Sequence, residues 1–90
     1  WSQQKELIKL SLDHVVVERG RTQKEYTWKE FRTFTAFEVT KNNKNEIKLG
    51  FKSKGQEVAI GDFLNNEDKE DLKFEISKII HHLNDLRPAG

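Results

Sequence analysis

The sequence contains no cysteine and no methionine, and it lacks any long hydrophobic run. Without cysteine no disulfide or thiolate site can form, and because small domains outside the cytoplasm often depend on disulfides, a reducing compartment is favoured. Because methionine is missing even at position 1, we expect the chain to be a piece excised from a longer protein. No apolar run approaches the roughly 18 residues of a membrane span, and no signal peptide is visible.

Length and charge exclude several classes of protein. Ninety residues, about a third of them apolar, predict one small domain over 1–90 with a single core. The net charge of +1 is neither the basic bias of many nucleic-acid binders nor the acidic bias of many disordered tails. Residues 1–60 carry twelve Lys and Arg against eight Asp and Glu, whereas residues 61–90 carry four against seven. The first two thirds are therefore basic and the last third is acidic.

Alternating apolar and polar residues predict six strands in the first sixty residues, because a period of two is typical of a half-buried strand. The predicted ranges are 7–12, 15–19, 25–31, 32–40, 47–51 and 58–60. In the fourth range Phe37 and Val39 share one phase and Phe34 has the other, which indicates a bulge or two partly covered faces.

A helix is predicted at about 66–86. Asn65 is a good N-cap, and acidic residues follow in the first turn, where the helix dipole favours carboxylates. An apolar stripe continues until Arg87 and Pro88 end the helix. Phe74 lies outside this stripe, about 200° around the helix from Leu72, so it is either covered by a loop or part of an exposed contact surface.

Together these elements predict an α+β fold, in which a twisted antiparallel sheet of five to six strands is closed by one C-terminal helix. This layout is similar to that of small pleckstrin-homology-like domains. The corner 61–64 should join the sheet to the helix, with Phe63 and Leu64 as packing anchors. The expected core consists of Ile8, Leu10, Leu12, Val15, Val17, Trp28, Phe37, Val39, Ile47, Leu49, Val58, Ile60, Phe63, Leu72, Ile76, Ile79 and Leu83.

The sequence offers no convincing catalytic, metal or cofactor motif. His81 and His82 are helix neighbours that point about 100° apart, so they cannot share one ion, and only Asp85 lies near His81 at helical spacing. His14 follows Asp13 at a predicted turn and has no nucleophile to activate. The acidic residues near 67–71 lack the calcium-loop pattern, and the glycines lack a phosphate-loop context. We therefore expect a protein that is not an enzyme and that binds neither a cofactor nor a metal.

A basic strand surface is the remaining candidate for binding. Arg19, Arg21, Lys24, Lys29 and Arg32 are interleaved with aromatic residues. Such a pattern suits phosphate binding and base stacking, it suits an anionic bilayer, and it also arises in any solvated strand with one face in the core. Several glutamates dilute the positive charge, which makes nucleic acid the weaker interpretation. The predicted interaction surface consists of Arg19, Arg21, Lys24, Lys29 and Phe74.

The segment that follows the last turn resembles part of a bacterial membrane-protein family, domain of unknown function 2244. The matching features are a strand, the corner V-x-I-G-x-F-L, a polar cap and an acidic first helical turn. They are carried by Gly55, Val58, Ile60, Gly61, Phe63, Leu64, Asn65, Glu67 and Asp68, with weaker likeness upstream at Leu10, Leu12, Val15, Val17, Glu18 and Arg19. The chain departs from the family in having Asn65-Asn66 where Ser-Pro or similar is usual, and in lacking a pair of membrane helices.

The resemblance implies a soluble C-terminal domain of an inner-membrane protein, facing the cytoplasm, and it brings no catalytic residues. We therefore expect a non-enzymatic binding or assembly domain whose partner is another protein or the inner-membrane surface. The alternative is a free-standing cytoplasmic module that binds nucleic acid or a phospho-ligand through the basic strand surface. Strong dependence of binding on salt would distinguish the alternative.

Overall fold

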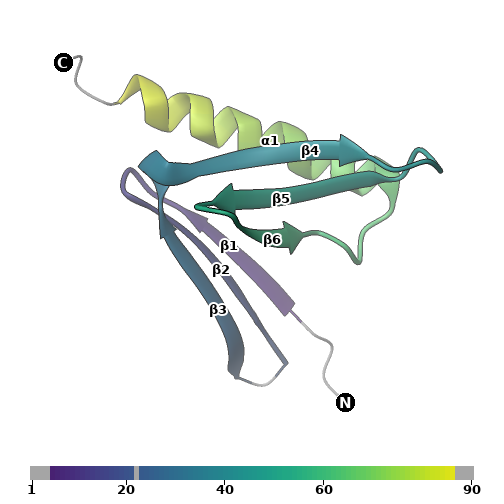
Figure 1. Cartoon of the computed structure of the whole chain (residues 1–90), viewed down its shortest axis with the longest axis horizontal. Coiled ribbons are helices and arrows are strands. Elements are labelled where there is room, and N and C mark those ends of the chain that lie inside the picture. Colours follow the sequence, from purple (N-terminus) through teal and green to yellow (C-terminus); the bar gives the residue numbers. More distant parts are fainter. Residues whose placement is uncertain (1–4, 22, 87–90) are drawn as a thin grey trace.

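The structure is a computed structural model that describes residues 5–21 and 23–86, with only the backbone of Lys24 (Figure 1). Six strands, one short 3-10 helix and one long α-helix follow one another along the chain. They are β1 (Lys5–Leu10), β2 (His14–Gly20), β3 (Lys24–Phe31), η1 (Arg32–Phe34), β4 (Thr35–Lys41), β5 (Ile47–Ser53), β6 (Gln56–Ile60) and α1 (Asn66–Asp85). The predicted α+β class with antiparallel strands and a C-terminal helix is confirmed.

The prediction of a single sheet of five to six strands was wrong. The strands form two three-stranded antiparallel sheets, one in the order β1-β2-β3 and one in the order β4-β5-β6. Figure 1 shows that the two sheets run at a steep angle to each other, with α1 alongside the second. Each sheet is a meander of consecutive strands.

The break between the sheets falls at η1, inside the range predicted as the fourth strand. There the backbone N–H of Arg32 donates to the carbonyl of Asp13 at 2.8 Å, and the Thr35 hydroxyl donates to the carbonyl of Phe31 at 2.8 Å. These two bonds turn the chain at η1, so β4 leaves the first sheet and pairs with β5. The odd phase of Phe34 reflects this corner, not a bulge within a continuous strand.

The inner faces of the two sheets meet in the core. Ile8, Val17 and Trp28 lie opposite one another across β1, β2 and β3, so their side chains share one face. Trp28 then stacks on Phe51 of β5, with ring centroids 6.4 Å apart and planes 19° apart. The buried core residues are Val15, Val17, Trp28, Ile47, Leu49, Phe51, Val58, Ile60 and Ile76.

The core prediction erred at its margins. Leu12, Val39 and Ile79 are about 40% exposed, because the turn after β1, the edge strand β4 and the outer side of α1 receive no full cover from neighbouring elements. Phe51 is 1% exposed and was missing from the predicted core. Its alternation with Ile47 and Leu49 in β5 was the available signal.

The corner before α1 is built differently from the prediction. Gly61 has a φ of +65°, a left-handed value that favours glycine, and its N–H donates to Glu6 Oε1 at 2.8 Å. The N–H of Leu64 donates back to the carbonyl of Gly61 at 3.0 Å, and the Leu64 side chain lies beside Gly61. Phe63 is 74% exposed, so it is not a packing anchor.

Polar contacts attach the first turn of α1 to the start of β5. The predicted N-cap is confirmed, since Asn65 Oδ1 accepts from the N–H of Asp68 at 2.8 Å. Asn66 bonds in two directions, accepting from the N–H of Ile47 and donating to the carbonyl of Asn45, both at 3.0 Å. The buried Lys69 donates from Nζ to the carbonyl of Ile47 at 2.9 Å. These bonds fix where the helix begins relative to the second sheet.

Candidate functional site

Arg19, the first residue of the predicted interaction surface, holds the two sheets together. Its Nε lies 2.8 Å from Glu6 Oε2, its Nη2 donates to the carbonyl of Ala59 in β6, and its guanidinium stands over the ring of Tyr26 at 5.2 Å. Glu6, whose side chain is only 8% exposed, also accepts from Gly61. We call these contacts of Glu6 and Arg19 with β6 and Gly61 the inter-sheet tie. Because its guanidinium already has these partners within the fold, Arg19 is poorly placed to bind an external ligand.

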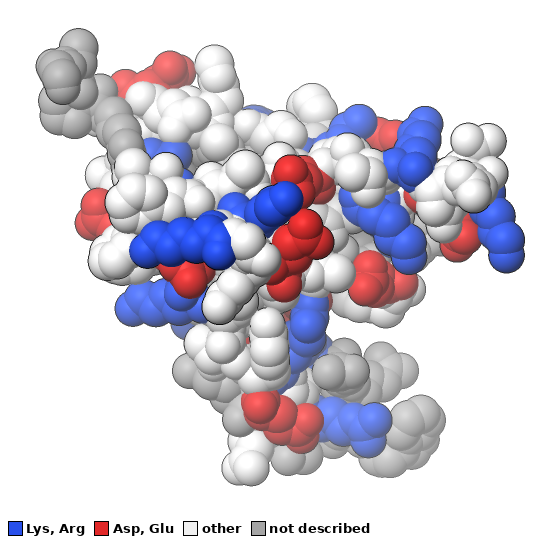
Figure 2. Space-filling model, in the orientation of Figure 1, with Lys and Arg blue, Asp and Glu red and all other residues white. Residues whose placement is uncertain are grey.

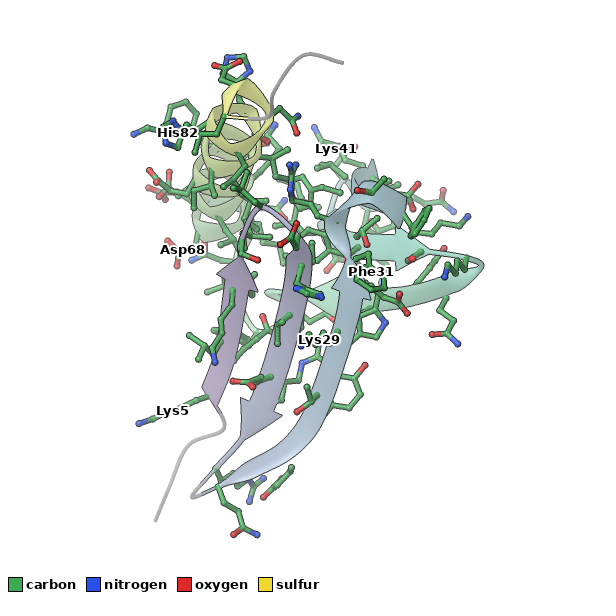
Figure 3. The ribbon with its side chains drawn as sticks, turned by 90° about the vertical axis from the view of Figure 1, so that its left-hand side faces the viewer. Lys5, Lys29, Phe31, Lys41, Asp68 and His82 are labelled. Carbon is green, nitrogen blue, oxygen red and sulfur yellow. The ribbon has the colours of Figure 1, made fainter. Side chains whose placement is uncertain are left out.

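The other predicted residues do not converge on one surface. Arg21 is exposed in the turn after β2, and the side chain of Lys24 lies outside the described residues. Lys29 is opposite Val16, on the outer face of the first sheet, whereas Arg19 is opposite Tyr26 on the inner face. Phe74 is 64% exposed on α1, which matches the exposed alternative and not the loop-covered one. Figure 3 shows Lys29 on the first sheet, well apart from the helix that carries Asp68 and His82.

The surface charges are mixed. Lys and Arg are interspersed with Asp and Glu over the face seen in Figure 2, without a continuous basic field on that face. On the first sheet Lys9 pairs with Glu18 at 3.3 Å, and on the second Lys52 lies 3.7 Å from Glu57. His81 Nε2 lies 3.6 Å from Asp85 Oδ2, and both side chains are largely exposed. Among residues 5–21 and 23–86, no group of three or more His, Cys, Asp or Glu side chains is placed to hold a metal ion.

A hollow lies between β4 and α1, and we call it the β4–α1 groove. Its volume is about 540 Å³. Thr35 and Phe37 of β4 form one wall, and Ser77, Ile80, His81 and Asn84 of α1 form the other. Val15 and Phe51 belong to the core beneath it, and Arg32 and Thr33 of η1 also line it. The groove thus lies where the two sheets and the helix meet.

The groove exists because α1 packs on β5 and leaves the inner side of β4 partly open. Ile76 is buried against the core, whereas Phe37 is only partly buried and Val39 is 40% exposed. Thr35, Phe37 and Val39 alternate along β4 and therefore share one face. β4 pairs with β5 on one side, and its other edge has no strand partner among the described residues. An uncovered strand face and an unpaired strand edge therefore adjoin.

Arg32 provides the formal positive charge of the groove. Its Nε donates to the carbonyl of Leu12 at 3.0 Å and its Nη1 donates to Asn84 Oδ1 at 2.6 Å, so the guanidinium links η1 to the first sheet and to the helix. Its Nη2 is buried and has no hydrogen-bond partner within the described structure. No carboxylate pairs with Arg32 there either. Because both hydrogen-bond partners are neutral, the positive charge of Arg32 is not compensated.

Exposed aromatic rings lie next to η1. Phe31 and Phe34 are 53% and 56% exposed, and their rings meet edge to face with centroids 6.3 Å apart. Lys54 Nζ stands 4.9 Å from the centroid of the Phe34 ring, and the ring centroids of His14 and Phe31 are 5.1 Å apart. Because Arg32 and Thr33 lie between the two phenylalanines in the chain, this aromatic pair adjoins the groove. Large exposed rings of this kind are frequent at protein interfaces.

Sequence reasoning did not find the groove. It included Arg32 among the basic residues interleaved with aromatic ones and within a predicted strand, but it could not pair Arg32 with Asn84, which lies 52 residues away. The phase change at Phe34 was the one local signal of the corner that brings these residues together.

Comparison with known proteins gives the family and leaves the finer fold description without support. In the described ranges no helix is both long enough and apolar enough to cross a membrane. No curated protein and no solved structure matches the chain, so likeness to pleckstrin-homology domains finds no support there. A family model described as integral membrane protein (DUF2244) matches residues 2–80. Because this match covers most of the sequence, including both sheets and most of α1, the chain belongs to the DUF2244 family of integral membrane proteins.

Proposed function

We propose that this chain is a non-enzymatic binding or assembly domain of a bacterial inner-membrane protein, that it faces the cytoplasm, and that its partner is another protein. The observation that carries the proposal is the β4–α1 groove, with an unpaired strand edge on one side and a partly buried guanidinium at η1. Family membership supports the membrane context.

A protein partner fits this groove better than a membrane surface does. Binding to an anionic bilayer favours basic residues gathered on one accessible side. Here Arg19 is held by Glu6 on the inner face of its sheet and Lys29 points from the outer face. A strand edge with unpaired N–H and C=O groups, by contrast, is a ready template for another polypeptide. The same separation of basic residues weighs against the nucleic-acid or phospho-ligand alternative.

Site-specific photocrosslinking in cells tests the protein-binding part of the proposal. A photoreactive phenylalanine analogue would replace Ser77, which is exposed and lines the groove, in the full-length protein in its own membrane. We expect a discrete crosslinked protein from this position. The matched control replaces His82, which is exposed on α1 and does not line the groove. Crosslinks to lipid alone, or identical products from both positions, would contradict a protein-binding groove.

The orientation is tested separately by cysteine labelling. The described domain offers no native thiol, so His82→Cys introduces one exposed label into it. In spheroplasts a membrane-impermeant maleimide should label this cysteine only after the inner membrane is permeabilised. Labelling of intact spheroplasts would place the domain on the opposite side of the membrane and would refute the cytoplasmic assignment.

A further inference from the structure

We propose that the β4–α1 groove binds an extended segment of the partner protein, which adds a fourth strand beside β4 and places an Asp or Glu side chain against Arg32. This inference rests on the proposed function and specifies the chemistry of the partner. Three features of the groove support it, namely the edge of β4, the open face of β4 and the charge of Arg32.

The edge of β4 supplies the backbone contacts. β4 is an outer strand of its sheet, and the pairing with β5 uses only one of its two edges. The other edge presents N–H and C=O groups over seven residues, Thr35–Lys41. An added strand satisfies such groups independently of its own sequence, which is how extended peptides join exposed sheet edges in many complexes.

The open face of β4 supplies the side-chain contacts. A strand added to β4 would direct every second side chain to the same side as Thr35, Phe37 and Val39. On that side lies the hollow of about 540 Å³ whose far wall includes Ser77 and Ile80 of α1. This volume is within the range of about 300–1,000 Å³ that is usual for ligand sites, so several side chains fit. The segment should therefore carry apolar residues at alternate positions.

The charge of Arg32 supplies the specificity. Its guanidinium is fixed by Leu12 and Asn84, both neutral acceptors, and Nη2 lacks a partner in the described structure. A carboxylate in the groove is the natural complement, because it would neutralise this charge and accept a charge-assisted hydrogen bond from the guanidinium. Other charged or titratable residues near this end are Lys54, which stands over Phe34, His81, which lies 3.6 Å from Asp85, Asp13, whose carbonyl accepts from the Arg32 N–H, and His14, which lies against the Phe31 ring. Within η1 the charged residue is Arg32, and no carboxylate of the described residues pairs with it, which favours an acidic segment.

A second copy of this chain fits the same edge less well. Antiparallel pairing of two β4 strands in full register would centre on Glu38, the middle residue of Thr35–Lys41, and would set the two Glu38 side chains directly opposite each other. Like charges in directly opposite positions destabilise a strand pair. The occupant that the groove favours is therefore a segment of a different protein.

Selection from a library of random ten-residue peptides displayed on phage, with the purified 90-residue chain as bait, tests the inference. We expect the selected peptides to share alternate apolar residues and one Asp or Glu. Titration of a synthetic selected peptide by fluorescence anisotropy should show about tenfold weaker binding to Arg32→Gln, since a charge-assisted hydrogen bond is lost. Replacing the acidic residue of the peptide by its amide should weaken binding similarly. The loss of affinity with both changes together should be smaller than the sum of the two separate losses, because both remove the same contact.

A second variant guards against misfolding of Arg32→Gln. Ser77→Trp fills the groove with an indole while removing no described contact, and it should weaken peptide binding at least about tenfold. His82→Trp adds the same ring about 140° further around α1 and should leave binding within about twofold. In NMR spectra, peptide should shift the backbone amides of Thr35–Lys41 and of the groove-lining part of α1.

Several results would overturn the inference. They are selected peptides without an acidic residue, binding that is insensitive to Ser77→Trp, amide shifts confined to the first sheet, or dimerisation of the chain through β4. Its failure is distinguishable from failure of the proposed function. A crosslinked partner at Ser77 without any selected acidic peptide would support the proposed function and reject the added acidic strand. Binding of acidic peptides without a crosslinked protein in cells would support the groove's preference for an acidic strand and reject the proposed function.

Discussion

Replacing Glu6 by Ala should strongly destabilise the fold, because Glu6 is the centre of the inter-sheet tie. Its side chain is 8% exposed and accepts two hydrogen bonds at 2.8 Å, one from Arg19 Nε and one from the N–H of Gly61. Hydrogen bonds to a charged group contribute about 1.5–3 kcal/mol each. Arg19 is 26% exposed, so water will partly compensate its loss of a partner. We expect the free energy of unfolding to fall by about 2–4 kcal/mol.

Urea unfolding followed by far-UV circular dichroism measures this loss. A surface pair in the same protein provides the control, since Glu57 and Lys52 lie 3.7 Å apart and the Glu57 side chain is 67% exposed. Glu57→Ala should cost no more than about 1 kcal/mol. If Glu6→Ala cost no more than Glu57→Ala, the two sheets would not be held by this tie and the reasoning would be refuted.

A double-mutant cycle separates the two bonds of Glu6. In an Arg19→Ala background Glu6→Ala should still be destabilising, because the N–H of Gly61 loses its acceptor, but by about 1 kcal/mol or more less than in the native background. Equal losses in the two backgrounds would show that Glu6 and Arg19 act independently.

Substitutions at three further positions test other parts of the fold by the same unfolding assay. Ile76→Ala should cost about 2–5 kcal/mol, because Ile76 is 3% exposed in the core, and an unchanged melting temperature would contradict the docking of α1. Asn65→Ala should cost about 1 kcal/mol through loss of the N-cap bond, whereas Asn65→Asp should retain most of the stability. Phe63→Ser should change stability by less than about 0.5 kcal/mol, since the ring is 74% exposed, and a larger loss would mean that Phe63 packs after all.

Local patterns predicted the local structure of this chain well. The period of two in β5 and the N-cap at Asn65 each depend on residues close in sequence, and both are present in the structure. The length of the helix followed from its apolar stripe in the same way, with α1 ending at Asp85. The division into two sheets was missed, because an alternating pattern tells that strands form but not which strands pair.

The candidate site could not be predicted from local patterns either, because such patterns do not show which distant segments come together. Basic residues were grouped by their nearness in sequence, but pairing in the first sheet sends Arg19 and Lys29 to opposite faces. The hydrogen bonds that build the inter-sheet tie and the groove join residues far apart in the sequence. Glu6 is bonded to Gly61 across 55 residues, and Arg32 is bonded to Asn84 across 52. Phe63 was misplaced because its apolar character could not reveal that Leu64 takes the position beside Gly61.

The consecutive order of strands within each sheet has a consequence for how the chain folds. Each sheet can assemble from a contiguous stretch, Lys5–Phe31 or Thr35–Ile60, by closing only short turns. Joining them closes a much longer loop, which carries a larger entropy cost and slows folding. We expect the two meanders to form early and to dock late, so pulse-labelled hydrogen exchange during refolding should show strand amides protected before the amide of Gly61. Simultaneous protection would mean that the two halves nucleate as one.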